Sequence, residues 1–371
     1  MQQLDDILKA LAAALAAEGP AVDFGDEVTT VSLPAHPEAA VVVRTSGSTG
    51  RPKAVVLSAE ALAASSLATA EELRAEGQWL LALPLQYVAG VQVLIRSLYA
   101  GTRPWAMDLD QSFTPEAFVT AADELTDPIR LTSLVPTQLA RLLEDPTEDV
   151  LRVLRRFHAI LLGGAAVAPG LLARARELSV NVVTTYGSAE TSGGCVYNGR
   201  PLDGVDVRLV DGRVHLGGPT LADGYLDDPE ATWDAFIELD GERFFRTSDL
   251  GELLPDGTLR VTGRVDDVIN SGGSKVSALD VQHALEALDG VAQAFVGGIP
   301  SAEWGQSVAA AVVLSPGARW EAGELAEALR AGFGPLRPRH VSLWGSLPLL
   351  PNGKVDRQAI LGRLRDEHGG K

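Results

Sequence analysis

Short runs of β-branched residues alternate with helical stretches along the first half of the chain, and this alternation constrains the fold most. The strand-like runs include residues 39–46, 158–164 and 180–187, and the helical stretches include residues 58–74 and 136–145. Strands that alternate with helices are typical of parallel sheets covered by helices. We therefore predict that this part of the chain forms α/β layers.

From about residue 204 the pattern changes to short strands separated by glycine and Asp-Gly turns, as in residues 205–218 and 251–264. An Asp-Gly pair between apolar runs favours an antiparallel hairpin. A β-rich subdomain is thus expected to complete a large first domain that spans residues 1–264.

The rest of the chain predicts a second, small α+β domain over residues 265–371, with the boundary at residues 264–267. Ser277 and Asp280 are placed to start a helix as a capping box, and Gly290 is placed to end it. Two domains also suit a chain of 371 residues, because one domain takes roughly 100–200 residues.

Composition and charge exclude several classes of protein. The 31 lysine and arginine residues against 49 aspartate and glutamate residues give a net charge of −18, which argues against a general nucleic-acid binder. The first residues carry acids where a signal peptide needs bases, and Lys9 and Glu18 interrupt their apolar part, so we expect a cytoplasmic protein without a membrane span. The single cysteine, Cys195, excludes an internal disulfide and is expected to be a small buried side chain.

The strongest local signal is a loop rich in glycine and hydroxyl groups that follows a predicted strand and ends in a lysine. Glycines let a ligand approach the backbone, hydroxyls and amides donate hydrogen bonds, and lysine adds positive charge, which together suit a polyphosphate. The spacing does not match the P-loop, and a flexible turn is the alternative for such a loop taken alone. The loop comprises Thr45, Ser46, Gly47, Ser48, Thr49, Gly50 and, at its end, Lys53.

Further segments place ligand-binding residue types after predicted strands, at the edge where open α/β sheets bind ligands. Glu190, within residues 186–191, can hold Mg²⁺ through its carboxylate or cap a helix. Residues 163–165 leave room for a flat base or make a tight turn. Asp249 can accept hydrogen bonds from two ribose hydroxyls or form a turn, and Lys354 can be a surface lysine beside an Asn-Gly turn.

These segments, in this order and over residues from about 40 to 360, resemble the adenylate-forming superfamily of acyl-CoA synthetases, luciferases and peptide-synthetase adenylation domains. The resemblance implies that a carboxylate reacts with ATP to form an acyl adenylate, and that the acyl group then passes to the thiol of coenzyme A. ATP, Mg²⁺ and coenzyme A are therefore the implied cofactor and co-substrates.

The resemblance also implies roles for individual residues. Lys354, Glu190 and Lys53 are the implied catalytic residues, and Glu190 is the implied magnesium ligand. The small domain is implied to be mobile and to rotate about the hinge residue Asp266. The implied ATP-binding and AMP-binding residues are Thr45, Ser46, Gly47, Ser48, Thr49, Gly50, Gly163, Gly164, Ala165, Thr185, Tyr186, Gly187, Ser188, Asp249 and Arg264. The residues implied to meet the pantetheine arm of coenzyme A are Ser271, Gly272, Gly273 and Lys275.

Two features depart from the superfamily pattern. The phosphate-binding loop begins at residue 45, whereas most members carry a longer segment before it, so part of the usual first subdomain is expected to be missing or reduced. Tyr87 stands where many members have a histidine, and a phenol with a pKa of about 10 is a poor base at neutral pH.

The short N-terminus and residues 83–96 and 186–204 resemble the o-succinylbenzoate-CoA ligases of menaquinone biosynthesis, in their compact form. This narrower resemblance implies a substrate with an aromatic ring and two carboxylates. Arg96 lies in an otherwise apolar helix and requires a partner, which is either a protein carboxylate or the non-reacting carboxylate of the substrate. The expected acyl pocket comprises Tyr87, Arg96, Ser192, Gly193 and Gly194.

The sequence leaves other activities open. These are another aryl or medium-chain acyl-CoA ligase, a stand-alone adenylation enzyme that loads a carrier protein, and a nucleotide-binding protein without catalysis. The expected partners are a small carboxylic acid, ATP and coenzyme A, with neither nucleic acid nor membrane, and a homodimer is an option that the sequence leaves open.

Overall fold

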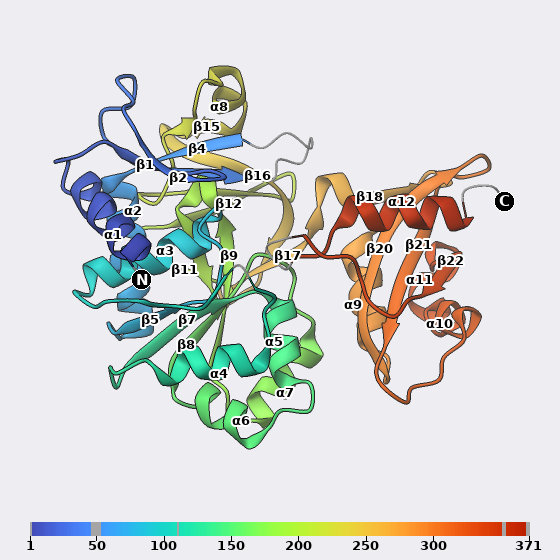
Figure 1. Ribbon diagram of the computed structural model, residues 1–371. Helices are drawn as coiled ribbons and strands as arrows, with labels where there is room; N and C mark the ends of the chain where they lie inside the picture. Colours follow the sequence, from blue (N-terminus) through green and yellow to red (C-terminus); the bar gives the residue numbers. More distant parts are fainter. Residues whose placement is uncertain (1, 46–52, 110, 351–353, 369–371) are drawn as a thin grey trace.

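The structure is a computed structural model that describes residues 2–45, 53–109, 111–350 and 354–368. Figure 1 shows a large body, coloured blue to yellow, beside a smaller body, coloured orange and red, with the chain crossing between them after β17 (Leu259–Arg264). Among the described helices, none is long and apolar enough to cross a membrane.

A seven-stranded sheet in the order β11-β10-β9-β8-β7-β5-β6 forms the centre of the large body. The strands from β5 to β9 run parallel, which confirms the predicted α/β layers, and β10 and β11 add an antiparallel edge. The strands are β5 (Gln78–Leu81), β6 (Trp105–Ala106), β7 (Arg130–Leu134), β8 (Phe157–Leu162), β9 (Val182–Ser188), β10 (Gly193–Tyr197) and β11 (Arg200–Pro201). The helices of this layer are α3 (Val88–Tyr99), α4 (Pro115–Asp123), α5 (Pro136–Leu143), α6 (Glu148–Leu154) and α7 (Pro169–Glu177).

The first strand that the sequence predicts belongs to a second, five-stranded sheet in the order β14-β4-β3-β1-β2. β3 runs parallel to β1, as expected, whereas β3 and β4, which follow one another in the chain, are antiparallel. The reason is that only a short loop joins them, whereas parallel neighbours need a crossover of a dozen or more residues. The members are β1 (Ala21–Phe24), β2 (Val28–Val31), β3 (Ala39–Thr45), β4 (Lys53–Ser58) and β14 (Gly224–Tyr225).

Two helices border this second sheet, α1 (Gln2–Leu15) and α2 (Ala59–Leu73). Ser58 begins α2 as the sequence predicts, because its side chain accepts a hydrogen bond from the backbone N–H of Ala61. Buried aliphatic side chains of α1, β1, β3, β4, α2 and α3 form one hydrophobic core between the two sheets.

A third, antiparallel sheet confirms the predicted β-rich subdomain. At its first hairpin Asp211 and Gly212 have φ angles of 51° and 76°, the left-handed backbone that an Asp-Gly hairpin turn requires. The strands are β12 (Asp206–Val210), β13 (Arg213–Gly217), β15 (Phe236–Leu239), β16 (Glu242–Leu253) and β17, and α8 (Pro229–Ala235) precedes β15.

The smaller body has its own sheet and its own hydrophobic clusters on the two faces of that sheet. Ser277 caps α9 by accepting a hydrogen bond from the N–H of Asp280, as predicted, but α9 ends at Glu286 and not at Gly290. Hydrogen bonds from Leu288 N–H to Leu285 and from Val291 N–H to Leu288 make a turn of residues 287–290, and β20 begins at Val291.

The strands of the smaller body are β18 (Val268–Ser271), β19 (Ser274–Ser277), β20 (Val291–Ser301), β21 (Gly305–Leu314) and β22 (His340–Leu343). Its helices are α9 (Ala278–Glu286), α10 (Ala322–Ala328), α11 (Arg330–Phe333) and α12 (Arg357–His368).

Candidate active site

The turn after β8 lies where the two bodies meet. Gly163 donates its N–H to the carbonyl of Leu134 at the end of β7, and a side chain at Gly163 would clash with the hydroxyl of Thr185 on β9. Gly164 has a φ of +82°, and a methyl group there would stand 2.8 Å from Cε of Lys354 and 3.3 Å from its Nζ. The structure therefore brings a lysine of the smaller body onto a glycine turn of the large body.

Lys354 lies on a chain reversal of the smaller body. Leu350 donates its N–H to the carbonyl of Lys354 at 2.8 Å, and Leu349 pairs with Val355 across the reversal. The predicted Pro351-Asn-Gly turn lies outside the described residues. Burial lowers the pKa of the Lys354 amine, because the charged form is less well hydrated there.

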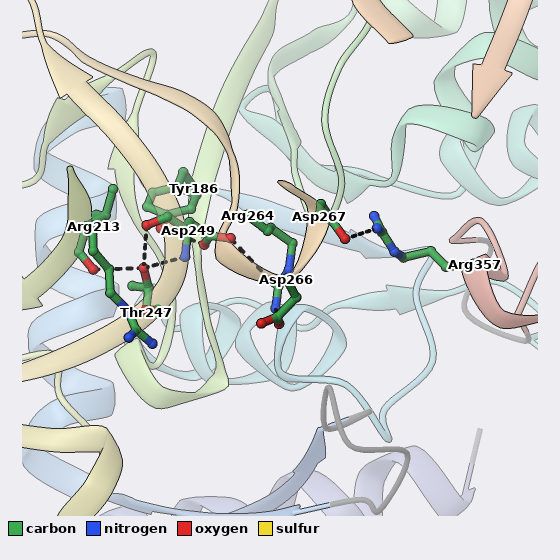
Figure 2. A network of polar contacts seen from close by, with 9 residues as sticks. Tyr186, Arg213, Thr247, Asp249, Arg264, Asp266, Asp267 and Arg357 are labelled. Atoms are coloured by element: carbon green, nitrogen blue, oxygen red, sulfur yellow. Dashed lines mark hydrogen bonds and ion pairs between the residues drawn. The ribbon is translucent and has the colours of Figure 1, made fainter. Parts of the chain in front are cut away.

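A polar network on β9, β16 and β17 lies on the large body just before the crossing (Figure 2). The Tyr186 hydroxyl donates to Oδ2 of Asp249 at 2.8 Å, and Nη1 of Arg264 donates to Oδ1 of the same carboxylate at 3.2 Å. Nη2 of Arg264 reaches Asp266 at 3.4 Å. Tyr186 and Arg264 thus both contact the carboxylate of Asp249, next to the predicted hinge residue. All three residues were predicted to contact the nucleotide.

An ion pair connects the start of the smaller body with the segment that carries Lys354 (Figure 2). Asp267, in the short 3-10 turn Val265–Asp267, accepts a hydrogen bond from Nη2 of Arg357 at the start of α12. Burial raises the pKa of the Asp267 carboxyl although the charge of Arg357 opposes the shift. Neither residue was predicted from the sequence to have a role in the site.

Glu190 is buried at 7% exposure in the 3-10 turn Ala189–Thr191, directly after β9. Its Oε1 accepts a hydrogen bond of 2.8 Å from the hydroxyl of Tyr225. Burial, and the charge of Glu190, raise the pKa of this phenol, which therefore stays a donor. No ion pair in the described part of the chain includes Glu190. Carboxylate oxygens are hard ligands of the kind that Mg²⁺ prefers, so Glu190 fits a magnesium ligand.

The two ends of the predicted phosphate-binding loop lie side by side, because Thr45 at the end of β3 pairs with Lys53 at the start of β4. The amine of Lys53 lies over the ring of Tyr225, 4.4 Å from its centroid. Ser46, Gly47, Ser48, Thr49 and Gly50 lie outside the described residues.

In the β9–β10 hairpin, the backbones of the two strands lie close together around residues 187–194. A side chain at Gly187 would clash with the carbonyl of Gly193 across the hairpin. The Thr191 hydroxyl accepts a hydrogen bond from the N–H of Ser188 at 3.0 Å and donates to the carbonyl of Gly193 at 2.8 Å. Cys195 is buried in β10, as expected, and burial raises the pKa of its thiol to about 12.

Helix α3 presents Gln92 and Arg96 to this hairpin. Gln92 donates to the carbonyl of Ser192 at 2.5 Å, and its Cγ would stand 3.4 Å from a side chain at Gly193. Arg96, at 6% exposure, donates to the hydroxyl of Tyr197 at 3.2 Å, and its guanidinium lies 5.3 Å from the ring centre of Trp79.

Of the two partners expected for Arg96, a protein carboxylate or a carboxylate of the substrate, the first is not found among the described residues. Within the described residues Arg96 forms no ion pair, and its Nε is buried without a hydrogen-bond partner. Aromatic neighbours offset part of the cost of burying the charge, since a guanidinium stacks favourably on a ring face.

The remaining predicted residues are Tyr87 in the large body and the segment from Ser271 to Lys275 in the smaller body. Tyr87 caps the start of α3 without a side-chain hydrogen bond to the helix, and burial raises the pKa of its phenol. The segment from Ser271 to Lys275 forms the β18–β19 hairpin, in which Gly272 donates its N–H to the carbonyl of Trp304 at 3.0 Å.

Three residues of the site, Tyr225, Asp267 and Arg357, were not predicted from the sequence. The only local signal for Tyr225 was an aromatic residue with a polar group after a glycine, in Gly224-Tyr225, and a folded contact was needed to connect it with Glu190.

Comparisons with known proteins extend this description. Residues 3–226 match the family described as AMP-binding enzyme, and residues 280–354 match the AMP-binding enzyme C-terminal domain. A probable 2-succinylbenzoate–CoA ligase of Mycobacterium tuberculosis (strain CDC 1551 / Oshkosh) is 39% identical over 338 residues, which cover 89% of this chain and 86% of that protein.

Two solved structures share the fold over most of the chain. The ATP-bound MatB from Rhodopseudomonas palustris has a TM-score of 0.79 and 25% identity, and the match covers 91% of this chain and 70% of that one. The o-succinylbenzoate CoA synthetase MenE from Bacillus subtilis, in complex with its acyl-adenylate intermediate, has a TM-score of 0.73 and 25% identity, with 90% and 72% covered.

Proposed function

We propose a function for this chain, which belongs to the AMP-binding enzyme family. It is an AMP-forming acid–thiol ligase. It converts o-succinylbenzoate to its CoA thioester through an acyl adenylate. The observation that carries the proposal is the position of Lys354 over the Gly163–Gly164 turn, beside the network of Tyr186 and Asp249. The names of the relatives support the choice of acid.

The nucleotide would be held by the groups that meet at the edge of the central sheet. The Gly163–Gly164 turn has no side chains of its own, so a flat adenine can approach its backbone closely. The carboxylate of Asp249, held by Tyr186 and Arg264, can accept hydrogen bonds from the ribose hydroxyls.

Adenylation by these residues depends on charge and position. A carboxylate substrate with a pKa of about 4 is ionised at neutral pH, so the first step needs no general base. The carboxylate oxygen attacks the α-phosphorus and pyrophosphate leaves with its bonding electrons. Lys354 and Lys53 stabilise the negative charge that collects on the phosphates during this displacement. When bound by Glu190, Mg²⁺ would neutralise further phosphate charge.

The second step requires that Lys354 leave the site, because the thiol of coenzyme A needs access to the same acyl carbon. We assign residues 1–264 to the AMP-binding domain and residues 265–371 to a domain that rotates about Asp266. The hairpin from Ser271 to Lys275 would then face the adenylate. In this orientation the thiolate attacks the acyl carbon and AMP leaves. We assign the reaction to the cytoplasm, because ATP and coenzyme A are its co-substrates.

The choice of acid rests on the contact between α3 and the β9–β10 hairpin. Arg96 is a buried guanidinium with an unsatisfied Nε and with no protein carboxylate among its described contacts. A dicarboxylic acid has a second, non-reacting carboxylate that can pair with such a group directly or through water. Tyr87 and Gly193 would border the aromatic ring of the substrate.

The proposal is tested with a panel of carboxylic acids in two assays. ATP–pyrophosphate exchange measures adenylation, and thioester formation with coenzyme A measures the complete reaction. We expect o-succinylbenzoate to support both, with benzoate and medium-chain fatty acids much weaker. Exchange with every acid but without a CoA thioester would favour a carrier-loading adenylation enzyme, and absence of exchange would exclude catalysis.

A further inference from the structure

Tyr225 contacts both Glu190 and Lys53, which come from different sheets. Glu190 follows β9 of the seven-stranded sheet, whereas Lys53 begins β4 of the second sheet. The Tyr225 hydroxyl donates to Oε1 of Glu190 at 2.8 Å, and the amine of Lys53 lies 4.4 Å from the centre of the same ring.

The position of Tyr225 is fixed on several sides. Tyr225 pairs with Val55 on β4, and its backbone N–H donates to the hydroxyl of Thr232 at 2.9 Å. Its ring packs edge-on against Phe236 with 6.1 Å between centroids, and only 6% of the residue is exposed. A side chain held in this way can fix the groups that it touches.

Glu190 and Lys53 have opposite charges and would attract each other. A direct ion pair would neutralise the carboxylate that a cation needs and the ammonium that a phosphate needs. In the described part of the chain no ion pair joins them, and each contacts Tyr225 instead. The phenol of Tyr225 donates to Oε1 of Glu190 and so orients the carboxylate, which leaves Oε2 able to bind a cation. The ring face of Tyr225 attracts the ammonium group of Lys53.

We propose that Tyr225 is a positioning residue that holds Glu190 for the divalent cation and Lys53 for the phosphates, and that keeps the two charges apart. This inference rests on the proposed function, because it concerns the same nucleotide site. The hydroxyl serves the cation and the ring serves the lysine, so the two contributions can be separated by substitution.

The test uses the full chain with an ATP analogue that has a methylene group between the α- and β-phosphorus atoms and is not cleaved. Mn²⁺ affinity is measured by electron paramagnetic resonance with the analogue bound, and analogue affinity is measured separately in EDTA. We expect Tyr225→Phe to weaken Mn²⁺ binding about tenfold and to leave analogue binding in EDTA within about twofold. Tyr225→Leu should weaken both, since it also removes the ring under Lys53.

The control is Tyr99→Phe, which removes a hydroxyl from a tyrosine of α3 outside the proposed nucleotide site and should change neither affinity. Unchanged Mn²⁺ affinity in Tyr225→Phe, or equal losses of Mn²⁺ and analogue binding in that variant, would overturn the inference while the proposed function stands. A wild-type chain that binds neither the analogue nor Mn²⁺ would overturn both.

Discussion

Gly164 lies directly beneath the side chain of Lys354, at a distance that leaves no room for a methyl group without displacing the lysine. The two residues come from different bodies of the molecule, so their contact defines one relative orientation of those bodies. In the proposed reaction this is the orientation for adenylation, and it makes the two half-reactions separable by mutation.

We expect Lys354→Ala to lower adenylation by about a hundredfold to a thousandfold, as for the loss of one charge-stabilising group. Thioester formation from a supplied acyl adenylate should stay within a few-fold of wild type, because the lysine serves only the first orientation. Gly164→Ala should show the same selectivity more weakly, since the added methyl group would press on Cε of the lysine. Parallel loss of both half-reactions in Lys354→Ala would contradict the division of roles.

Asp266→Pro is expected to spare adenylation and to block transfer to coenzyme A. Proline fixes φ near about −65°, and the backbone at residue 266 can then no longer turn. Pyrophosphate exchange and CoA thioester are measured separately, with Asp266→Ala as the matched variant that shortens the side chain but leaves the backbone mobile. The hinge assignment fails if the proline and alanine variants behave alike.

Arg96→Ala should weaken transition-state binding of o-succinylbenzoate by roughly 2–5 kcal/mol, as for a buried charge pair that loses one member. The Michaelis constant for ATP should hardly change, because the described contacts of the Arg96 guanidinium are with Trp79 of β5 and Tyr197 of β10 and not with the Gly163–Gly164 turn. Values of kcat/KM are compared for the dicarboxylic acid and for benzoate-type monocarboxylic acids. Arg103→Ala, which removes an exposed arginine, is the control. An equal effect of Arg96→Ala on every acid would remove it from substrate choice.

Glu286 makes the stability of the smaller body depend on pH. Burial raises the pKa of its carboxyl to about 7, well above the value of about 4.3 for an unfolded chain. Between these two pKa values the folded protein holds a proton that the unfolded chain has released. The stability that the protonated Glu286 contributes is therefore complete below about pH 4 and is lost as the pH rises to 7.

We expect Glu286→Gln to remove this dependence, because the amide oxygen can still accept from Ala294 N–H and from Gln282. At pH 8 the variant should be more stable than wild type by about 1–3 kcal/mol, and the difference should shrink at pH 5. Urea unfolding at the two pH values measures this. Glu303→Gln, at an exposed position of the same body, should show no such trend.

The elements that the sequence predicted correctly are those with strong local signals. β8, β9, α2 and the Asp211-Gly212 hairpin each carry their own periodicity, cap or turn residues. The antiparallel pairing of β3 with β4 was not predicted, because the β-branched composition of β3 is equally suited to either direction. The loop between the strands contained the missing information, since it is too short for a crossover.

For the candidate site, the sequence identified residue types but not their partners. Asp249 and Tyr186 are distant in sequence and adjacent in space, and both were predicted from the family resemblance. For Arg96 the sequence left open a protein carboxylate or a substrate carboxylate as partner, and the described contacts of its guanidinium are with Trp79 and Tyr197. Tyr225 was missed because its two contacts depend on how two sheets pack, which no local pattern of residues records.

The chemistry of Cys195 makes the proposed relative motion of the two bodies accessible to a direct test. It is the only cysteine of the chain, it is buried in β10, and its thiol is hardly ionised at neutral pH, so a maleimide dye should not react with it. Cysteines introduced at Glu60 in the large body and Ala328 in the smaller one, both exposed, would then take a fluorescent donor and acceptor without removing any native residue that the fold requires. The native chain is therefore already a suitable background for following each catalytic cycle as a change in energy transfer.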